Sequence, residues 1–166
     1  MNILIEAIAI TLIYEAFVVG LILIKGPIFM INDYPPAIQH RVKSQNLVDE
    51  SALPKKGNGV INDIVGCAVM MILFVGTSYF INGERTFWPA FWQAYIFGNA
   101  ISWFDALVLD CLWFCHSKRF VIPGTEDMVK DYHDYWFHVK FALAGLVAMA
   151  VPAAIFGGLI CLLAAI

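Results

Sequence analysis

The chain has 166 residues, of which 61% are hydrophobic and only 14% are charged, and its mean hydropathy is +0.76. Soluble domains contain roughly 45–50% apolar and about 25% charged residues, so this composition excludes an ordinary soluble domain. The formal net charge of −3, without any basic stripe, gives no support to a nucleic-acid partner. We therefore predict an integral membrane protein whose first partner is the lipid bilayer.

Four segments are long and apolar enough to cross a bilayer, which takes roughly 20 residues of helix. They are residues 3–24, 60–81, 88–115 and 136–165. The first lacks the basic start and the small-residue cleavage site of a signal peptide, so we expect it to stay as a span. The predicted fold class is all-α, with residues 1–166 forming one transmembrane domain: an antiparallel bundle of four transmembrane helices.

The distribution of basic residues predicts the orientation of the spans. Segments 25–59 and 116–135 carry nearly all of the lysines and arginines, whereas the short connection between spans two and three has only Arg85. Positive charge marks cytoplasmic loops. We therefore predict that both long loops are cytoplasmic and that the N- and C-termini lie outside.

The first long loop contains a helix signal. Residues 32–36, Asn-Asp-Tyr-Pro-Pro, are typical of a helix start, because proline is tolerated in the first turn. The following segment, residues 37–48, places Ile38 and Val42 on one face, which predicts a short amphipathic helix on the inner leaflet. Residues 54–59 are expected to end it.

Two acidic side chains lie deep inside predicted spans, Glu15 in the first and Asp105 in the third. Counted at about 1.5 Å per residue from the cytoplasmic boundaries, both are roughly 14 Å deep. An ionised carboxylate in hydrocarbon costs at least about 2.5 kcal/mol, so such residues usually mark ion or proton pathways. We predict that Glu15 and Asp105 form a proton- or cation-binding pocket; the alternative is a structural pair of protonated carboxyls.

Other polar residues gather nearer the cytoplasmic boundary. Asp110 and Lys140 each lie about 7 Å deep, which predicts an ion pair between them, and His116 and His138 lie at the inner rim. On an α-helix Asp105 and Asp110 would point about 140° apart, so we expect them to have different neighbours. The inner group is predicted to form the cytoplasmic mouth of the site.

The last loop suggests a second, metal-binding site. Pro123-Gly124 predicts a turn and Thr125 an N-cap, from which a helix is expected to run directly into the fourth span. Spacing of i, i+4, i+7 and i+11 puts four side chains on one face of that helix, namely Asp127, Asp131, Asp134 and His138. Such a set can hold a divalent metal such as Mg²⁺ or Mn²⁺, the one cofactor that the sequence suggests. The favoured alternative is a solvated acidic face with ordinary i,i+4 pairs.

The fourth span carries small residues four apart, a spacing that lets helices approach closely. These pairs are Ala144/Ala148, Ala153/Gly157 and Ala154/Gly158. They serve either packing within one chain, which we favour, or a homo-oligomer interface. Pro152 is expected to kink this span.

One stretch carries a resemblance. Residues 109–120 (LDCLWFCHSKRF), residues 122–128 (IPGTEDM) and Tyr34-Pro35-Pro36 resemble a group of small four-span bacterial membrane proteins that has no established function. The resemblance implies a bacterial inner-membrane protein and transfers no functional residue.

Three functions are compatible with these patterns. The leading prediction is a small oligomeric proton- or cation-coupled transporter, or a channel-like protein, that uses the intramembrane carboxylates. The first alternative is a membrane-embedded metal-dependent enzyme acting on a lipid or quinone, and the second is an accessory subunit of a membrane complex. The sequence contains no P-loop, nucleophile elbow or HExxH motif that would favour an enzyme.

Overall fold

The computed structural model describes residues 2–49, 53 and 58–166, with the backbone alone over residues 58–63. Helices make up 80% of the chain and the described residues contain no strand, which confirms the all-α class. The long helices are, in chain order, α1 (Ile3–Lys25), α3 (Asn58–Val75), α4 (Phe87–Phe104), α6 (Tyr135–Ala148) and α7 (Ala150–Ala164). Two of them continue as π-helical segments, α3 into η2 (Gly76–Ile81) and α4 into η3 (Asp105–Phe114).

Three helical stretches in the described part are long and apolar enough to cross a membrane. They are Ile3–Lys25, Ile64–Ile81 and Phe87–Phe114. The fourth candidate is a bent pair, Val129–Ala148 with Ala150–Ala164, whose two parts make an angle of 44°. Length and composition therefore support three or four spans, and the side on which each loop lies stays a prediction.

The bend between α6 and α7 occurs at Met149, three residues before Pro152. Proline has no N–H to donate, and its ring clashes with the carbonyl four residues earlier, here that of Ala148. The predicted kink in this segment is thus confirmed. Met149 packs against Gly98 of α4, where a Cβ would lie 2.5 Å from the Met149 sulfur.

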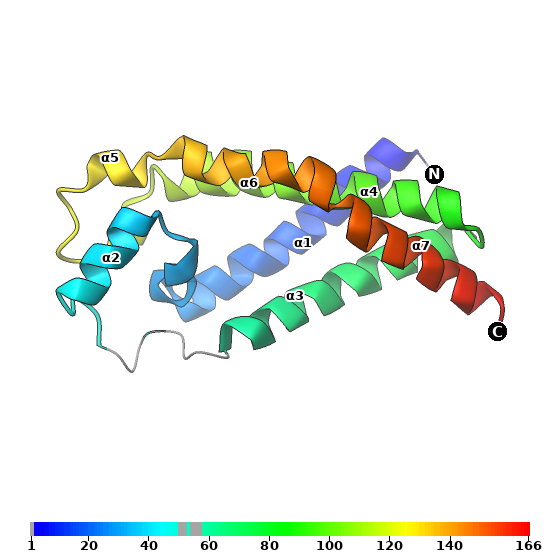
Figure 1. Cartoon of the computed structure of the whole chain (residues 1–166), viewed down its shortest axis with the longest axis horizontal. Coiled ribbons are helices and arrows are strands. Elements are labelled where there is room, and N and C mark those ends of the chain that lie inside the picture. The colour runs from blue at the N-terminus through cyan, green and yellow to red at the C-terminus, as the bar shows by residue number, and fades with distance from the viewer. Residues whose placement is uncertain (1, 50–52, 54–57) are drawn as a thin grey trace.

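Helix α4 is the element against which the other long helices pack. It contacts α1, α3, α6 and α7. Its residue Phe97 is fully buried, with its ring 5.5 Å from that of Phe74 on α3, and Phe74 in turn lies 5.9 Å from Phe156 on α7. Figure 1 shows the N- and C-termini at one end of this helical body and α2 and α5 at the other.

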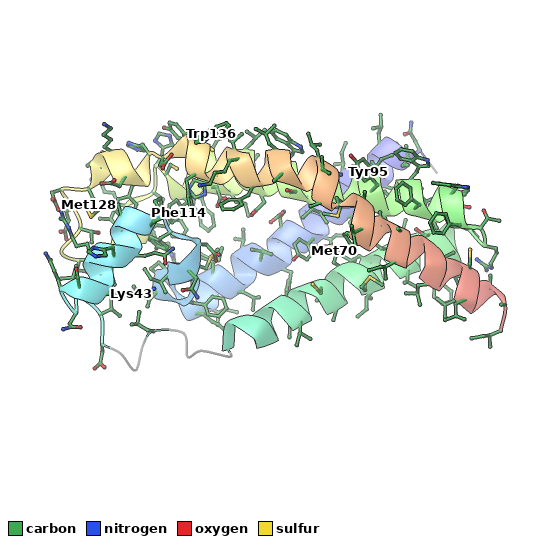
Figure 2. The ribbon with its side chains drawn as sticks, viewed as in Figure 1. Lys43, Met70, Tyr95, Phe114, Met128 and Trp136 are labelled. Atoms are coloured by element: carbon green, nitrogen blue, oxygen red, sulfur yellow. The ribbon has the colours of Figure 1, made fainter. Side chains whose placement is uncertain are left out.

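The small residues of α7 divide between two faces. Gly157 is buried against α4, where a Cβ would lie 3.0 Å from the backbone oxygen of Phe87, and Ala153 beside it is 1% exposed. This pair therefore serves packing within the chain, as favoured. Gly158 is exposed, as is Ala148 at the end of α6. Figure 2 shows Trp136 of α6 also pointing outward, as an aromatic side chain at a membrane boundary would.

The two long loops fold against each other into one small unit, which we call the cap (residues 26–49 and 115–134). Its elements are η1 (Pro27–Asp33), α2 (Pro36–Ser44), η4 (Lys118–Phe120) and α5 (Val129–Tyr132). The apolar core of the cap continues into the helical body through Ile22 at the end of α1 and Phe114 at the end of η3. Tyr34 ties the two loops together, because its hydroxyl donates to the carbonyl of Phe120 at 3.1 Å.

The predicted amphipathic helix exists as α2, but its expected place on the inner leaflet is wrong. Ile38 and Val42, which form its apolar face, are 0% and 1% exposed within the cap core. The last loop supplies an apolar surface through Phe120 and Ile122, so protein rather than lipid covers this face. Residues 54–57, within the segment where the helix was expected to end, lie outside the described residues.

The predicted continuous helix from Thr125 into the fourth span is also wrong. The Thr125 hydroxyl donates to the Ile122 carbonyl at 2.7 Å and thereby closes a turn. Helix α5 then covers only Val129–Tyr132, and the chain breaks before Asp134, whose carboxylate accepts from the Phe137 N–H and caps α6. Local side-chain-to-backbone hydrogen bonds thus replace the expected helical ones.

Candidate functional site

Glu15 lies near the middle of α1 and is buried against the other helices. Glu15 is only 3% exposed, and neither of its carboxylate oxygens has a hydrogen-bond partner among the described residues. Thr11, one turn earlier, is 4% exposed, and its hydroxyl likewise has no partner in the described part. The buried face of α1 therefore carries hydrogen-bonding groups, whereas its exposed face is apolar.

Asp105 is the first residue of the π-helical segment η3, and this changes its relation to Asp110. In a π-helix the backbone bonds join residues five apart, which brings such residues to the same face. The bond from the Cys115 N–H to the Asp110 carbonyl, 2.9 Å long, has this i→i+5 spacing. The expectation that Asp105 and Asp110 point about 140° apart assumed an α-helix and is wrong for that reason.

The structure brings these carboxylates together. Glu15 lies within electrostatic range of both Asp105 and Asp110. Asp105 in turn is within range of Asp110, of Asp33 in the cap and of His138 on α6. We call Glu15, Asp105 and Asp110 the acid cluster. Glu15 and Asp105, which the sequence paired by depth alone, are therefore within electrostatic range of each other, and the sequence did not associate Asp110 with them.

The partner of Asp110 is His138 and not Lys140. The Nδ1 atom of His138 lies 2.9 Å from an Asp110 carboxylate oxygen. Lys140 instead places its ammonium 4.6 Å from the ring centre of Phe137 and 5.0 Å from that of Phe141. Residues two apart on an α-helix point to nearly opposite sides, so His138 and Lys140 cannot both face η3. The predicted Asp110–Lys140 ion pair is replaced for this reason.

His138, the partner of Asp110, is buried. It is 5% exposed, and its Nε2 atom has no partner among the described residues. His116, expected to share the cytoplasmic mouth with it, lies elsewhere: its Nε2 is 3.0 Å from the hydroxyl of Tyr135, and its ring is 5.0 Å from that of His133. The two predicted rim histidines therefore belong to different environments.

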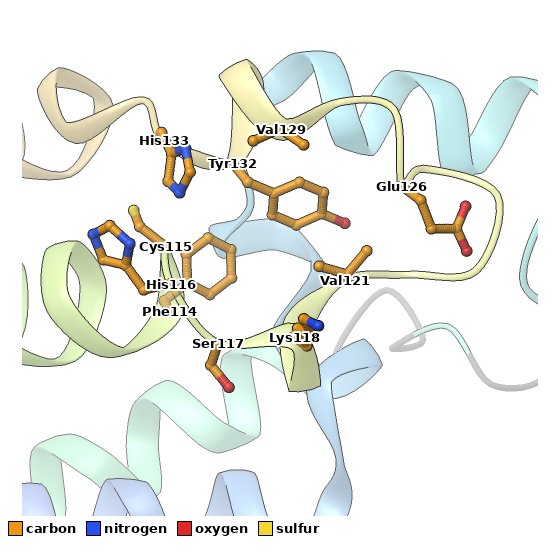
Figure 3. Close-up of a pocket in the computed structure, with 10 residues that line it drawn as sticks. All are labelled: Phe114, Cys115, His116, Ser117, Lys118, Val121, Glu126, Val129, Tyr132 and His133. Carbon is orange, nitrogen blue, oxygen red and sulfur yellow. The ribbon is translucent and has the colours of Figure 1, made fainter.

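His116 and His133 line a cavity of about 550 Å³ in the cap. Figure 3 shows both rings on one side of it, next to Cys115, with Glu126 at the far side. The Glu126 carboxylate accepts from the Gly124 N–H at 2.9 Å and so belongs to the turn. The residues that line this cavity are different from those of the acid cluster.

The four residues of the predicted metal site do not share a face. Asp127 pairs with Arg41 of α2, Asp131 lies on α5, Asp134 caps α6 and His138 binds Asp110. The break between α5 and α6 separates them, and among the described residues no group of three or more His, Cys, Asp or Glu could hold a metal ion. The Arg41 guanidinium holds the pKa of the Asp127 carboxyl below its usual range.

A second polar group, absent from the sequence predictions, lies toward the ends of α1 and α4 that are remote from the cap. Asn82 donates to a Glu6 carboxylate oxygen at 2.8 Å, Ser78 donates to the side-chain oxygen of Gln93 at 2.7 Å, and Gln93 donates to Glu84 at 3.3 Å. Glu6 is 2% exposed. A signal was available, since Glu6 and Gln93 each lie about one turn inside a predicted span.

Neither family models, curated proteins nor solved structures contain a match to this chain. The resemblance to small four-span bacterial membrane proteins therefore stays a prediction, and any function is argued from the site itself.

Proposed function

We propose that this protein is a small proton- or cation-coupled transporter or channel-like protein, and that the acid cluster is its exchange site. The observation that carries the proposal is the Glu15 carboxylate, 3% exposed and without a hydrogen-bond partner in the described part of the chain, with two more carboxylates in electrostatic range. Buried ionisable groups in membrane spans usually face a partner or a pathway.

The charge balance of the cluster supports uptake of a cation. Among the described residues no lysine or arginine forms an ion pair with Glu15 or Asp105, and only His138 bonds to a member of the cluster. Ionising three neighbouring carboxylates in a medium of low dielectric is costly because like charges repel and lose their hydration. A proton or a small cation relieves that cost, so the cluster is suited to bind one and release it.

Polar groups on both sides of the cluster support a path along α1. From Glu15 toward the termini, the same helix carries Thr11 and then Glu6 with its hydrogen-bond network. Glu6, Thr11 and Glu15 are each 2–4% exposed. Toward the cap, Asp110 and His138 are two further groups that can bind and release a proton. In the membrane we place the protein as a four-span antiparallel bundle with both termini outside, in a bacterial inner membrane, with His138 and Asp110 on the cytoplasmic side.

The alternatives receive less support. A metal-dependent enzyme needs a ligand set, and the acidic residues of the last loop are separated from one another. An accessory subunit that uses its carboxylates as interface contacts would present Glu15 outward, whereas Glu15 is buried. Assembly into a homo-oligomer stays part of the proposal, because four helices per chain enclose little room for a conduction path.

The test is proton flux into liposomes that contain the purified full chain and an internal pH-sensitive dye. We expect Glu15→Gln, which removes the exchangeable proton but keeps the shape, to lower the flux at least tenfold, and Asp105→Asn to do the same. Glu126→Gln makes the same chemical change in the cap and should leave the flux unchanged. Wild-type flux in Glu15→Gln would overturn the proposal.

A second readout concerns Glu15 directly. Carbodiimides react with protonated carboxyl groups, and hydrophobic ones reach those inside a membrane. We expect mass spectrometry to find dicyclohexylcarbodiimide attached to Glu15 in the wild-type protein, with labelling that decreases as the pH rises. Labelling that is confined to the exposed carboxyls of the cap would contradict a proton-binding Glu15.

A further inference from the structure

A groove between α1 and α4 ends beside the acid cluster. It has a volume of about 440 Å³, and its walls are apolar side chains of the two helices, including Leu4 and Ile8 of α1 and Ala100 and Phe104 of α4. Small-molecule sites in proteins commonly have volumes of about 300–1,000 Å³, so the groove has the size of a binding site. Leu4 and Ile8 are 65% and 61% exposed, which leaves the groove open toward lipid.

One of the residues that line this apolar groove is polar. Thr11 lines it, is 4% exposed and has a hydroxyl with no hydrogen-bond partner among the described residues. A buried hydroxyl without a partner is costly unless a ligand or a water satisfies it. Thr11 therefore marks a place in the groove where a ligand with a polar or charged centre would gain an interaction.

The acids lie just beyond the inner end of the groove along both helices, without lining it themselves. Glu15 follows Thr11 by one turn of α1, about 6 Å along the axis, and Asp105 directly follows Phe104. No lysine or arginine in the described part pairs with either carboxylate. An apolar groove that is open to lipid and lies next to carboxylates without a lysine or arginine partner is complementary, in shape and in charge, to a hydrophobic molecule with one positive charge.

We propose that the groove admits a lipophilic monovalent cation, such as a hydrophobic quaternary ammonium or phosphonium ion, from the membrane to the acid cluster. This inference rests on the proposed function and names its substrate class. The apolar substituents of the cation lie between α1 and α4, and its charge lies near Glu15. Binding releases the proton held by the cluster, so one cation is exchanged for one proton and the charge of the site is unchanged.

The exchange gives a definite pH dependence. The cation competes with a proton, so its affinity rises as the pH rises. The ionisable groups within electrostatic range of Glu15 are Tyr14 of α1 and Asp105 and Asp110 of η3, and Asp105 is in turn within range of Asp33 of η1 and His138 of α6. The aspartates among them add, when ionised, to the negative potential that favours a cation at high pH.

The experiment measures binding of tetraphenylphosphonium to the detergent-solubilised full chain by calorimetry, with proton release followed in weakly buffered solution. We expect about one proton released per cation bound and an affinity at pH 8 at least tenfold higher than at pH 5.5. Glu15→Gln should abolish both the binding and the proton release. Ala100→Trp, which fills the groove, should weaken binding at least tenfold.

The control for the filled groove is Ala148→Trp, which adds the same bulk to an exposed position of α6 and should leave binding unchanged. Circular dichroism and size-exclusion chromatography establish that each variant is folded, and Ala7→Leu replaces Ala100→Trp if the latter is not. Binding that survives in Glu15→Gln, or that is insensitive to both groove substitutions, would overturn the inference. A wild-type protein that conducts protons and reacts with carbodiimide at Glu15, but does not bind the cation, would overturn it while leaving the proposed function intact.

Discussion

Tyr34 is a fully buried side chain that joins the two halves of the cap. It is 0% exposed, and its hydroxyl donates to the carbonyl of Phe120, 86 residues away in the chain. Burial raises the pKa of this tyrosine above its ordinary value, with a smaller contribution from the neighbouring Tyr132. The phenol therefore stays neutral and remains a hydrogen-bond donor at any physiological pH.

We predict that Tyr34→Phe destabilises the protein, because the Phe120 carbonyl then has to do without its donor in a dry core. The expected cost is about 1–3 kcal/mol. It should appear as a lower midpoint of thermal unfolding in detergent, followed by the fluorescence of the tryptophans. Tyr135→Phe is the control: its hydroxyl bonds to His116 at the surface, and surface substitutions usually change stability by less than about 0.5 kcal/mol. Equal effects of the two substitutions would contradict this role of Tyr34.

At the scale of elements, the long apolar runs were sufficient to predict where the main helices lie, because segments such as Ile3–Lys25 have few alternatives to a helix in lipid. The π-helical register of η3 could not be predicted in this way. A π-helix is rare and has no local sequence signal in this segment, in which Asp110 contacts His138 of α6. Because the π-helical register was not predicted, the sequence did not indicate that Asp110 belongs to the acid cluster.

The close approach of α7 to α4 gives an element-scale prediction with a matched control. Gly157→Ala would place a Cβ 3.0 Å from the Phe87 backbone oxygen, so the neighbouring backbone of α4 must shift by a few tenths of an ångström, at an expected cost of about 1–3 kcal/mol. A Cβ on the next residue, Gly158, meets nothing within 4 Å. Gly158→Ala should therefore be neutral, or should stabilise the helix by up to about 1 kcal/mol. Thermal unfolding of both variants in one detergent would decide, and a larger loss in Gly158→Ala would refute the packing argument.

For the whole molecule, charge distribution is the one property of the sequence that bears on orientation. With Lys25, Arg41 and Arg119 at the cap end, we predict that the cap is cytoplasmic and the termini are outside. In a cysteine-free background, a membrane-impermeant maleimide should label Ala165→Cys in intact cells. Gln45→Cys in the cap should be labelled only after the cells are permeabilised. The reverse pattern would invert the proposed topology and the direction of the path.

The cap was the part of the molecule least accessible to prediction. Sequence patterns identified α2 through Ile38 and Val42, but an amphipathic face indicates only that something apolar covers it. Contacts between α2 and the last loop join residues about 80 positions apart, and a single sequence contains no local signal for such pairing. The acid cluster was easier to anticipate in part, since Glu15 and Asp105 are conspicuous in apolar surroundings wherever their neighbours lie.

The shared core of the cap has a mechanical consequence. Because Ile22 at the end of α1 and Phe114 at the end of η3 are packed into that core, these two helix ends are fixed relative to each other. At the opposite end, α1 shares a second buried core with α4 through Ala7 and Ile10, and Asn82 donates a hydrogen bond to Glu6. Helix α1 is therefore held at both ends, with Glu15 between the two points of attachment.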